Sequence, residues 1–398
     1  MPALLDRPVE RPRVADGELE LSVVMPCLNE ERTLPTCIAK ALAAMDEHGI
    51  SGEVIVVDNG STDRSVAVAR EHGARVVHQP LKGYGNALRK GFAEARGRYV
   101  IMGDCDESYD FRDVPRFVDR LRRGADIVMG NRLKGNIKPG AMPWLHERLG
   151  NPGLTRFVNL LFRTNCGDVY CGMRGMRKDA IERMNLQMPG MEFAPEMVIK
   201  STLAGLTMDE IPITLWPDGR DRKPHLRSFR DGWRGLRFML MCSPTALFVL
   251  PGLVLTLVGV LAMPAVLLAG YGSYTNFFSP NFLFGCCVLA VCGWHLLLFG
   301  FLAKLHAHHV DPVFRDERVE RLAAAFTVDR GLIGGLVLLA TAGALGVPVV
   351  LHWLRTLTLP APGQWIIAGT LFLLGFETVF ASFLVGILDL RRESRRVG

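Results

Sequence analysis

The pattern of apolar and polar positions divides the chain into two parts. Residues 1–237 mix short apolar runs with charged segments, whereas residues 238–303 contain no Asp, Glu, Lys or Arg. Two further apolar stretches follow at 331–354 and 365–388. Each stretch is long enough for a membrane helix, which needs about 20 apolar residues. We therefore predict four spans, at approximately 244–270, 281–303, 331–353 and 366–388.

The first part alternates strand-like and helix-like patterns. The expected strands cover residues 19–25, 53–57, 74–78, 99–102, 126–129 and 210–216. The expected helices cover 33–45, a segment ending near His72, the second part of 82–95, 151–163 and 192–203. Strands that alternate with helices favour a mostly parallel, Rossmann-like sheet. The predicted fold class is therefore α/β, followed by interfacial and membrane helices.

The terminal segment and the segment between the two parts differ from both parts in composition. Residues 1–18 are rich in Pro, Arg and acidic groups and lack the apolar core of a signal peptide, so we predict a disordered tail. Residues 228–241 place apolar residues such as Trp233 on one helical face and arginines on the other, as in a helix at a lipid interface. The expected layout is a tail (1–18), a soluble domain (19–227), an amphipathic segment (228–243), a membrane region (244–390) and a basic tail (391–398).

Charge sets the expected orientation and the class of partner. The connection at 304–330 and the tail at 391–398 are basic, whereas the loops at 271–280 and 354–364 carry almost no charge. By the positive-inside rule, the soluble domain, the 304–330 loop and the tail are cytoplasmic. The net charge of +6 suits anionic lipid or phosphate groups better than nucleic acid. Glu377 lies inside the last span, where it either satisfies a neighbouring helix or has a function.

One polar cluster directly follows the apolar run at 99–102. The stretch Tyr99–Asp110 reads YVIMGDCDESYD, so Asp104 and Asp106 come just after the expected strand. Ligands in open α/β sheets bind beyond the carboxyl ends of strands. Two carboxylates there can share a hard divalent cation, although a plain acidic loop is the alternative. No GxGxxG motif is present, which argues against a dinucleotide.

Other polar clusters follow the other expected strands. They are PCLNEE (26–31), DNGSTD (58–63), KGYGNALRKGF (82–92) and GNR (130–132). Asp58 could cap the next helix or accept a hydrogen bond from a base, and Lys82 is either solvated or a diphosphate contact. Arg132 and Lys134 open a basic segment that suits a phosphate-bearing acceptor, with a plain surface loop as the alternative.

Together, these motifs resemble family 2 glycosyltransferases with the GT-A fold. The similarity covers roughly residues 19–216 and is greatest to the polyprenyl-phosphate branch, which includes dolichyl-phosphate mannose and glucose synthases. The segment DVYCGMRGMR (168–177) resembles the D-x-x-x-G-F-R segment of that family, with Met173 in place of Phe. The run after Asp104 departs from the usual D-A-D pattern, so the donor and the third metal ligand stay open. The resemblance implies a nucleotide-sugar donor, Mg²⁺ or Mn²⁺, and inversion at the anomeric carbon.

The resemblance also implies roles for individual residues. The catalytic set is Asp104, Asp106, Asp168 and Arg132, and the metal ligands are Asp104 and Asp106. The basic run GRDRKPHLR (219–227) is typical of a positive-inside flank and also suits a clamp on the donor diphosphate, for which we select Arg222 and Lys223. The expected nucleotide-sugar site then comprises Pro26, Asn29, Glu30, Asp58, Lys82, Asp104, Glu196, Arg222 and Lys223. The acceptor phosphate is assigned to Arg132, Lys134 and Arg174.

The predicted activity is transfer of a hexose from UDP-glucose or GDP-mannose to a polyprenyl phosphate, giving a β-linked product. The expected partners are the donor, the lipid acceptor and the membrane, with no nucleic acid; a homo-oligomer stays open. One alternative is a processive glycan synthase, although the expected Q-x-x-R-W segment is absent. A second is a non-catalytic flippase or scaffold, against which the intact Asp104, Asp106 and Arg132 argue.

Overall fold

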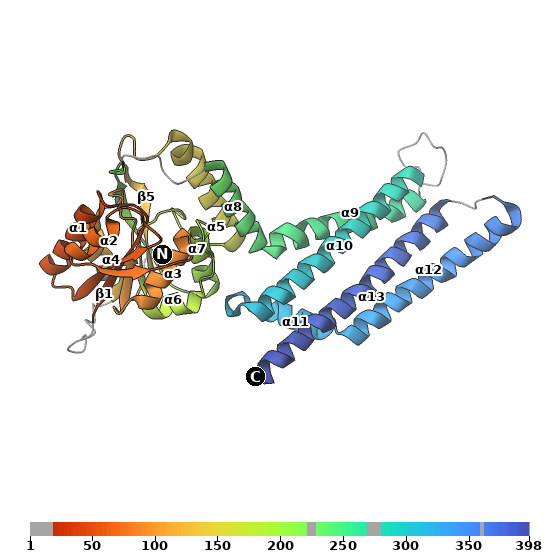
Figure 1. Ribbon diagram of the computed structural model, residues 1–398. Coiled ribbons are helices and arrows are strands. Elements are labelled where there is room, and N and C mark those ends of the chain that lie inside the picture. The colour runs from red at the N-terminus through yellow and green to blue at the C-terminus, as the bar shows by residue number, and fades with distance from the viewer. Residues whose placement is uncertain (1–18, 221–227, 269–279, 359–361, 398) are drawn as a thin grey trace. The chain divides into compact units, whose positions relative to one another are not determined.

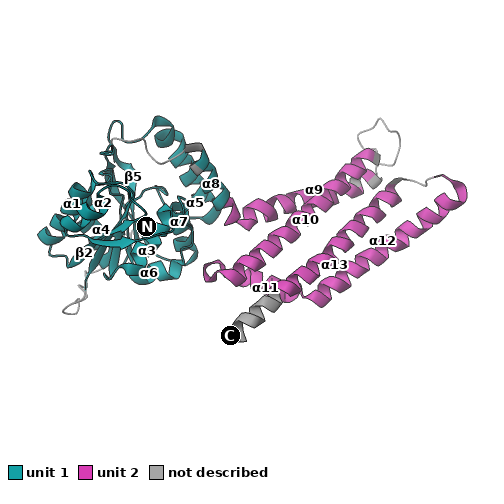
Figure 2. Ribbon diagram, in the orientation of Figure 1, with its two compact units in different colours: residues 1–239 teal, residues 240–398 magenta. Residues whose placement is uncertain are grey.

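The computed structural model describes residues 19–220, 228–268, 280–358 and 362–397. The chain forms two compact units, Met1–Met239 and Leu240–Gly398, which Figure 2 shows in two colours. The expected tail at 1–18 and the expected diphosphate contacts Arg222 and Lys223 lie outside the described residues.

A seven-stranded sheet forms the centre of the first unit, in the order β3-β2-β1-β4-β6-β5-β7. The strands are β1 (Leu21–Cys27), β2 (Gly52–Asp58), β3 (Arg75–His78), β4 (Tyr99–Met102), β5 (Ile127–Ile137), β6 (Arg174–Arg177) and β7 (Met208–Leu215). All neighbouring pairs are parallel except those that β6 makes with β4 and β5. The expectation of a mostly parallel α/β sheet is therefore confirmed. The short run RGMR that forms β6 was not predicted, because two arginines in four residues conceal the strand pattern.

Helices cover both faces of this sheet (Figure 1). The helices that precede the last strand are α1 (Leu34–Glu47), α2 (Ser65–Glu71), α3 (Tyr84–Glu94), α4 (Val114–Arg122), α5 (Asn151–Phe162), α6 (Lys178–Met184) and α7 (Phe193–Leu203). Helix α8 (Ser228–Met241) crosses the boundary between the two units. Leu34 and Ile38 of α1 share one buried cluster with Phe117 of α4. Leu88 of α3 and Phe193 of α7 belong to a second cluster. Helices α4 and α6 were not predicted from the sequence.

Strand β5 is longer than the sequence pattern indicates. It was expected to end at Met129 but runs to Ile137 beside β7, with an irregularity in register between Asn131 and Asn136. Gly135 permits this pairing, because a Cβ at that position would collide with the main chain of Ile213. Arg132 and Lys134 therefore lie on a strand rather than at the start of a loop.

The second unit is built from long helices. It contains α9 (Leu250–Leu268), α10 (Pro280–Val310), α11 (Glu317–Ala325), α12 (Val328–Thr356) and α13 (Pro362–Val397). Four stretches are long and apolar enough to cross a membrane: Thr245–Pro264, Asn281–Val310, Val328–Thr356 and Gly363–Leu388. These agree with the four expected spans, except that α10 extends past residue 303 and shortens the expected 304–330 loop. The basic residues at 391–397 continue helix α13.

Small residues and one polar pair join the membrane helices. Gly293 of α10 lies against the main chain of Thr256 on α9, and Gly335 of α12 lies against Gly375 of α13. Such close backbone approach is typical of helix packing in membranes. Glu377 on α13 accepts at 3.0 Å from His295 Nδ1 on α10, or donates to it, depending on which group holds the proton. This bond connects α10 with α13, in agreement with the interpretation that Glu377 satisfies a neighbouring helix.

Candidate active site

The loops that follow β1 and β2 are tied to each other. The Asn29 side chain accepts from the Thr62 main-chain N–H at 2.7 Å, and the Asn29 N–H donates to Ser61 Oγ at 3.0 Å. The Glu30 N–H donates to Ser65 Oγ at 2.7 Å. Asn29 adopts a positive φ of 59°, a conformation that Asn tolerates better than most residues. Residues 26–31 and 58–65 therefore form one rigid rim at the carboxyl edge of the sheet.

Asp58 closes the turn after β2. One oxygen accepts from the Ser61 N–H at 2.9 Å, and the other lies 3.1 Å from His78 Nδ1. Burial disfavours the charge of Asp58, but hydrogen bonds from Ser61 and His78 outweigh it and lower the pKa of the carboxyl group. Asp58 therefore does not cap α2, which begins at Ser65 with no side-chain cap bond, and its contact with a nucleoside stays a prediction.

The turn before α3 adds Lys82 to the same edge. The Gly83 N–H donates to Asn59 Oδ1 at 2.7 Å, which connects this turn to the loop after β2. A Cβ at Gly60 would lie 4.0 Å from Lys82 Cε, so the exposed Lys82 lies beside the Asp58 turn. This position is compatible with the diphosphate contact expected for Lys82.

Asp104 and Asp106 follow β4 at the same edge. Asp106 Oδ1 accepts from the Ser108 N–H at 3.0 Å and from the Ser108 hydroxyl, which fixes the carboxylate of this buried residue. The carboxylate of Asp104 lies close to Gly172, where a Cβ would come within 2.6 Å of Oδ2. Burial and the charge of Asp106 raise the pKa of Asp104 to about 6, although a hydrogen bond from Tyr84 opposes this rise. Two carboxylates that repel each other in this way favour a cation between them.

Arg220 supplies a positive charge to this acidic group. Its Nη1 lies 3.0 Å from Asp106 Oδ2, and its Nε lies 2.8 Å from Glu30 Oε1. It therefore bridges the loop after β1 and the loop after β4. The sequence indicated a basic run at 219–227. Of the residues of this run that the structure describes, Arg220 reaches the carboxylates.

Arg132 and Asp168 form a second group nearby. Arg132 Nε and Nη2 donate to the two Asp168 oxygens at 2.7 and 2.8 Å, and the Arg132 main-chain N–H donates to Oδ2 at 3.2 Å. Asp168 is fully buried and Arg132 is 8% exposed. Since Met102 pairs with Arg174, the segment 168–173 approaches the sheet edge that carries Asp104. Asp168 thus positions Arg132, and the catalytic role expected for Asp168 stays a prediction.

Three other expected site residues also bond to groups within the chain. Arg174 is fully buried and donates to the carbonyl groups of Cys171, Ala194 and Val169, so we leave it out of the acceptor site. The fully buried Glu196 accepts from the N–H groups of residues 187 and 188 and pairs with Lys200. It therefore holds a loop in place rather than facing a sugar directly. Lys134 pairs with Glu210 at 2.7 Å, yet its side chain is 66% exposed and accessible to a ligand.

The residues at this edge fit a hard divalent cation. Asp104 and Asp106 offer carboxylate oxygens, the ligand type that Mg²⁺ and Mn²⁺ prefer. In the described part of the chain, no group of three or more His, Cys, Asp or Glu residues could hold a metal by itself. Mg²⁺ is commonly bound by one or two carboxylates, with substrate phosphates and water as the other ligands. The donor set therefore suits a cation that binds together with a diphosphate.

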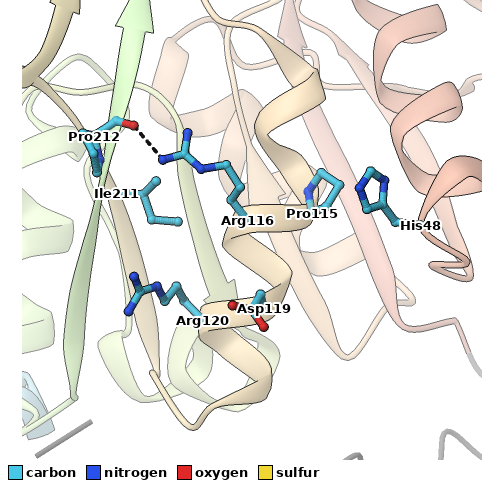
Figure 3. A pocket seen from close by; sticks show the side chains of 7 residues that line it. All are labelled: His48, Pro115, Arg116, Asp119, Arg120, Ile211 and Pro212. Atoms are coloured by element: carbon cyan, nitrogen blue, oxygen red, sulfur yellow. Dashed lines mark hydrogen bonds between the residues drawn. The ribbon is translucent and has the colours of Figure 1, made fainter. Parts of the chain in front are cut away.

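A pocket of ≈ 360 Å³ lies elsewhere in the same unit (Figure 3). Arg116, Asp119 and Arg120 of α4 line it together with Ile211 and Pro212 of β7. Arg116 donates to the Pro212 carbonyl at 3.1 Å and pairs with Asp113 at 2.7 Å. None of the residues at the carboxyl edge of the sheet lines this pocket, so we do not assign it to the active site.

Comparisons with known proteins agree with this geometry. The sequence profile of glycosyl transferase family 2 matches residues 22–184, and that of the family 2 C-terminal transmembrane region matches residues 301–389. The low-salt glycan biosynthesis hexosyltransferase Agl6 of Haloferax volcanii is 39% identical over 387 residues, which cover 94% of this chain and 91% of the relative. The chain belongs to glycosyl transferase family 2.

Other relatives match shorter parts of this family 2 glycosyltransferase. The dolichyl-phosphate hexose transferase of Haloferax volcanii is 31% identical over 194 residues, which cover 49% of this chain and 82% of the relative. Among solved structures, glucosyl-3-phosphoglycerate synthase of Mycobacterium tuberculosis with Mn²⁺, UDP and its product is 22% identical, with a TM-score of 0.46. That match covers 56% of this chain and 80% of the synthase. By the two profile matches, the enzyme joins a family 2 glycosyltransferase domain to a family 2 C-terminal transmembrane region.

Proposed function

We propose that this glycosyltransferase transfers a hexose from UDP-glucose or GDP-mannose to a polyprenyl phosphate. The observation that carries the proposal is that one sheet edge presents two carboxylates, suited to a metal–diphosphate complex, and a buried, oriented arginine, suited to a second anion. Asp104 and Asp106 provide the first site, and Arg132 with Asp168 provides the second. The similarity of the chain to a dolichyl-phosphate hexose transferase supports a lipid phosphate as that second anion.

Asp104 and Asp106 would hold Mg²⁺ or Mn²⁺. When bound, the cation stabilises the negative charge that develops on the leaving diphosphate. On this chain, Lys82 lies on the donor side, next to the turn that Asp58 closes. Pro26, Asn29, Glu30 and Asp58 form the rim at which we place the nucleoside.

Arg132 would hold the acceptor phosphate. Its Nε and Nη2 already bond to Asp168, which orients the guanidinium plane and leaves Nη1 for a phosphate oxygen. A buried guanidinium is suited to this role because it is always charged and forms directional bonds with phosphate oxygens. Lys134, two residues further along β5, adds an exposed positive charge.

The acceptor is itself a nucleophile, so the reaction needs no strong enzyme base. A phosphate monoester has a second pKa of about 6 and is largely dianionic at neutral pH. One of its oxygens attacks the anomeric carbon, a new C–O bond forms, and the bond from that carbon to the diphosphate breaks. Catalysis then depends on positioning and on stabilisation of the leaving group. In-line attack on an α-linked donor gives a β-linked product.

The membrane region would keep the enzyme in the same membrane as its lipid substrate. The positive-inside rule puts the catalytic domain on the cytoplasmic side of a multi-pass protein in the cell membrane, where nucleotide sugars are available. Helix α8, which ends only four residues before the first candidate span, fits an interfacial segment.

Product analysis with a panel of nucleotide sugars tests the proposal. Membranes that contain the full chain are incubated with radiolabelled UDP-glucose, GDP-mannose and other nucleotide sugars, with and without polyprenyl phosphate. We expect one donor to label an organic-extractable lipid carrying a single sugar, and only when the acceptor is added. A ladder of longer glycans would favour a processive synthase. The absence of transfer from every donor would favour a non-catalytic scaffold.

A further inference from the structure

Arg220 occupies a position that the sequence did not single out. It sits between two buried carboxylates that come from different loops, Glu30 after β1 and Asp106 after β4. Its own side chain is only 18% exposed. Burial disfavours the charge of Arg220, but the nearby charges of Asp106, Glu30 and Asp104 outweigh it and raise the pKa of the guanidinium. Arg220 therefore places a positive charge against both of these carboxylates.

The oxygen that Arg220 contacts is the one that a metal would need. Asp106 Oδ1 already accepts two hydrogen bonds from Ser108, which use its lone pairs. Oδ2, which faces Arg220 Nη1 at 3.0 Å, is thus the oxygen left for a divalent cation. A guanidinium and a divalent cation at the same oxygen would repel each other strongly in a poorly hydrated site.

The main chain keeps Arg220 at this place even if its side chain moves. The Gly219 N–H donates to the Asp106 carbonyl at 2.9 Å, and the Trp216 N–H donates to the Ser108 carbonyl at 3.0 Å. The segment that leaves β7 is therefore fastened to the loop that carries Asp106. Rotation of the Arg220 side chain is enough to release Oδ2, and the released guanidinium remains next to the site where the donor diphosphate is expected.

We propose that Arg220 is an exchangeable internal cation, which yields Asp106 to the metal and then bonds the donor diphosphate. The proposal rests on the function proposed above. It states that Arg220 makes binding of the metal depend on binding of the donor diphosphate. Metal alone must displace Arg220 without giving it a new anion, so it binds weakly. Metal that arrives with a diphosphate provides that anion, so it binds tightly.

Mn²⁺ binding without turnover tests the proposal. Electron paramagnetic resonance measures free Mn²⁺ in the presence of the purified, detergent-solubilised full chain, first alone and then with UDP or GDP. For the unchanged enzyme we expect weak binding that one nucleotide strengthens. For Arg220→Gln, the loss of a competing charge should strengthen binding of Mn²⁺ alone roughly tenfold or more and reduce the further gain from nucleotide.

Two variants control for other effects of the substitution. Arg75→Gln removes a guanidinium that likewise lies 2.8 Å from a glutamate, Glu53, but it lies at β3, and we expect wild-type Mn²⁺ binding. Arg220→Lys keeps the charge but offers one nitrogen to two carboxylates, so binding of Mn²⁺ alone should be intermediate. If Arg220→Gln does not fold, as judged by its thermal melt, this lysine variant decides the question.

The outcomes separate the inference from the proposed function. If the unchanged enzyme binds no Mn²⁺ even with UDP or GDP, the metal site of the proposed function is wrong and the inference fails with it. If the unchanged enzyme binds Mn²⁺ with nucleotide but Arg220→Gln and Arg220→Lys bind the metal alone no better than it does, only the inference is overturned.

Discussion

Two arginines at the same sheet edge are paired in different ways, and the difference indicates different roles. Arg132 gives both bonding nitrogens to one fully buried carboxylate, Asp168, whereas Arg220 divides its bonds between Glu30 and Asp106 on separate loops. Separating the first pair would leave a buried charge uncompensated, which costs about 3–5 kcal/mol. The second arrangement can be undone without that cost when another cation reaches the carboxylates. The Arg132–Asp168 pair is therefore a fixed part of the site, whereas the bonds of Arg220 to Glu30 and Asp106 can be replaced.

The largest expected effect is on the carboxylate that the metal and Arg220 share. Asp106→Asn should fold but show no detectable hexosyl transfer at any Mg²⁺ or Mn²⁺ concentration, because the amide removes the negative charge that holds the cation. Label incorporation into extracted lipid measures this. Asp110→Asn is the matched control, since Asp110 caps a short helical turn (Phe111–Asp113) and pairs with Arg112 outside the site. Normal activity in Asp106→Asn would exclude this carboxylate as a metal ligand.

Removal of the fixed arginine should affect the acceptor rather than the donor. Arg132→Ala should lower kcat/KM for polyprenyl phosphate about 100-fold, because a hydrogen bond to a charged group contributes about 1.5–3 kcal/mol. Binding of the nucleotide, measured by calorimetry, should change little. An equal loss of nucleotide affinity would move Arg132 into the donor site or into a purely structural role.

The partner of that arginine should show a smaller effect of the same kind. Asp168→Asn keeps the shape of the side chain but removes the charge, so Arg132 keeps a hydrogen-bond acceptor but is less firmly oriented. We expect kcat/KM for polyprenyl phosphate to fall roughly tenfold, corresponding to about 1.4 kcal/mol, with the nucleotide affinity retained. A variant that loses only thermal stability, with unchanged acceptor kinetics, would show that Asp168 does not act through Arg132.

A third arginine pair, away from the site, gives the smallest expected effect. Burial disfavours the charge of Glu53, but hydrogen bonds from Arg75 and Ser22 outweigh it and lower the pKa of the carboxyl group. Because the folded-state pKa lies below the unfolded value, ionised Glu53 stabilises the fold above the unfolded pKa, and this stabilisation is lost as pH falls through the folded pKa. The free energy of unfolding of the wild type should therefore decrease between pH 7 and pH 3 partly because this pair is lost. Glu53→Gln lacks the pair, so its decrease over the same range should be smaller by about 1 kcal/mol. Chemical denaturation at both pH values measures this, and identical losses would mean that the pair contributes nothing.

The sequence predicted the parts of the fold that follow a clear period or a long apolar run. The buried strand β4, the helix pattern of α1 and the four apolar spans all appear where expected. Strand β6 was missed because two of its four residues are arginines, one of them fully buried by bonds to main-chain carbonyls. The extension of β5 was missed because its outer residues are polar and pair with β7 only through tertiary contacts.

The candidate site could be found from the sequence, but its pairings could not. The order of the motifs predicted that Asp104, Asp106, Asp168 and Arg132 belong to one catalytic site. Whether a charged side chain faces a ligand or another side chain depends on neighbours far away in the chain. Thus Glu196 holds the loop at 187–188 and Arg174 bonds carbonyl groups, while Arg220, 114 residues (220 − 106) from Asp106, reaches the carboxylates.

The stereochemistry of the lipid product tests the central claim most directly. The product formed from the preferred α-linked nucleotide sugar and polyprenyl phosphate is extracted and its anomeric configuration is measured by NMR. Direct attack by the acceptor phosphate, held by Arg132 opposite the leaving diphosphate, predicts a β-linked sugar phosphate. An α-linked product would contradict direct displacement and the arrangement of donor and acceptor sites proposed for this edge of the sheet.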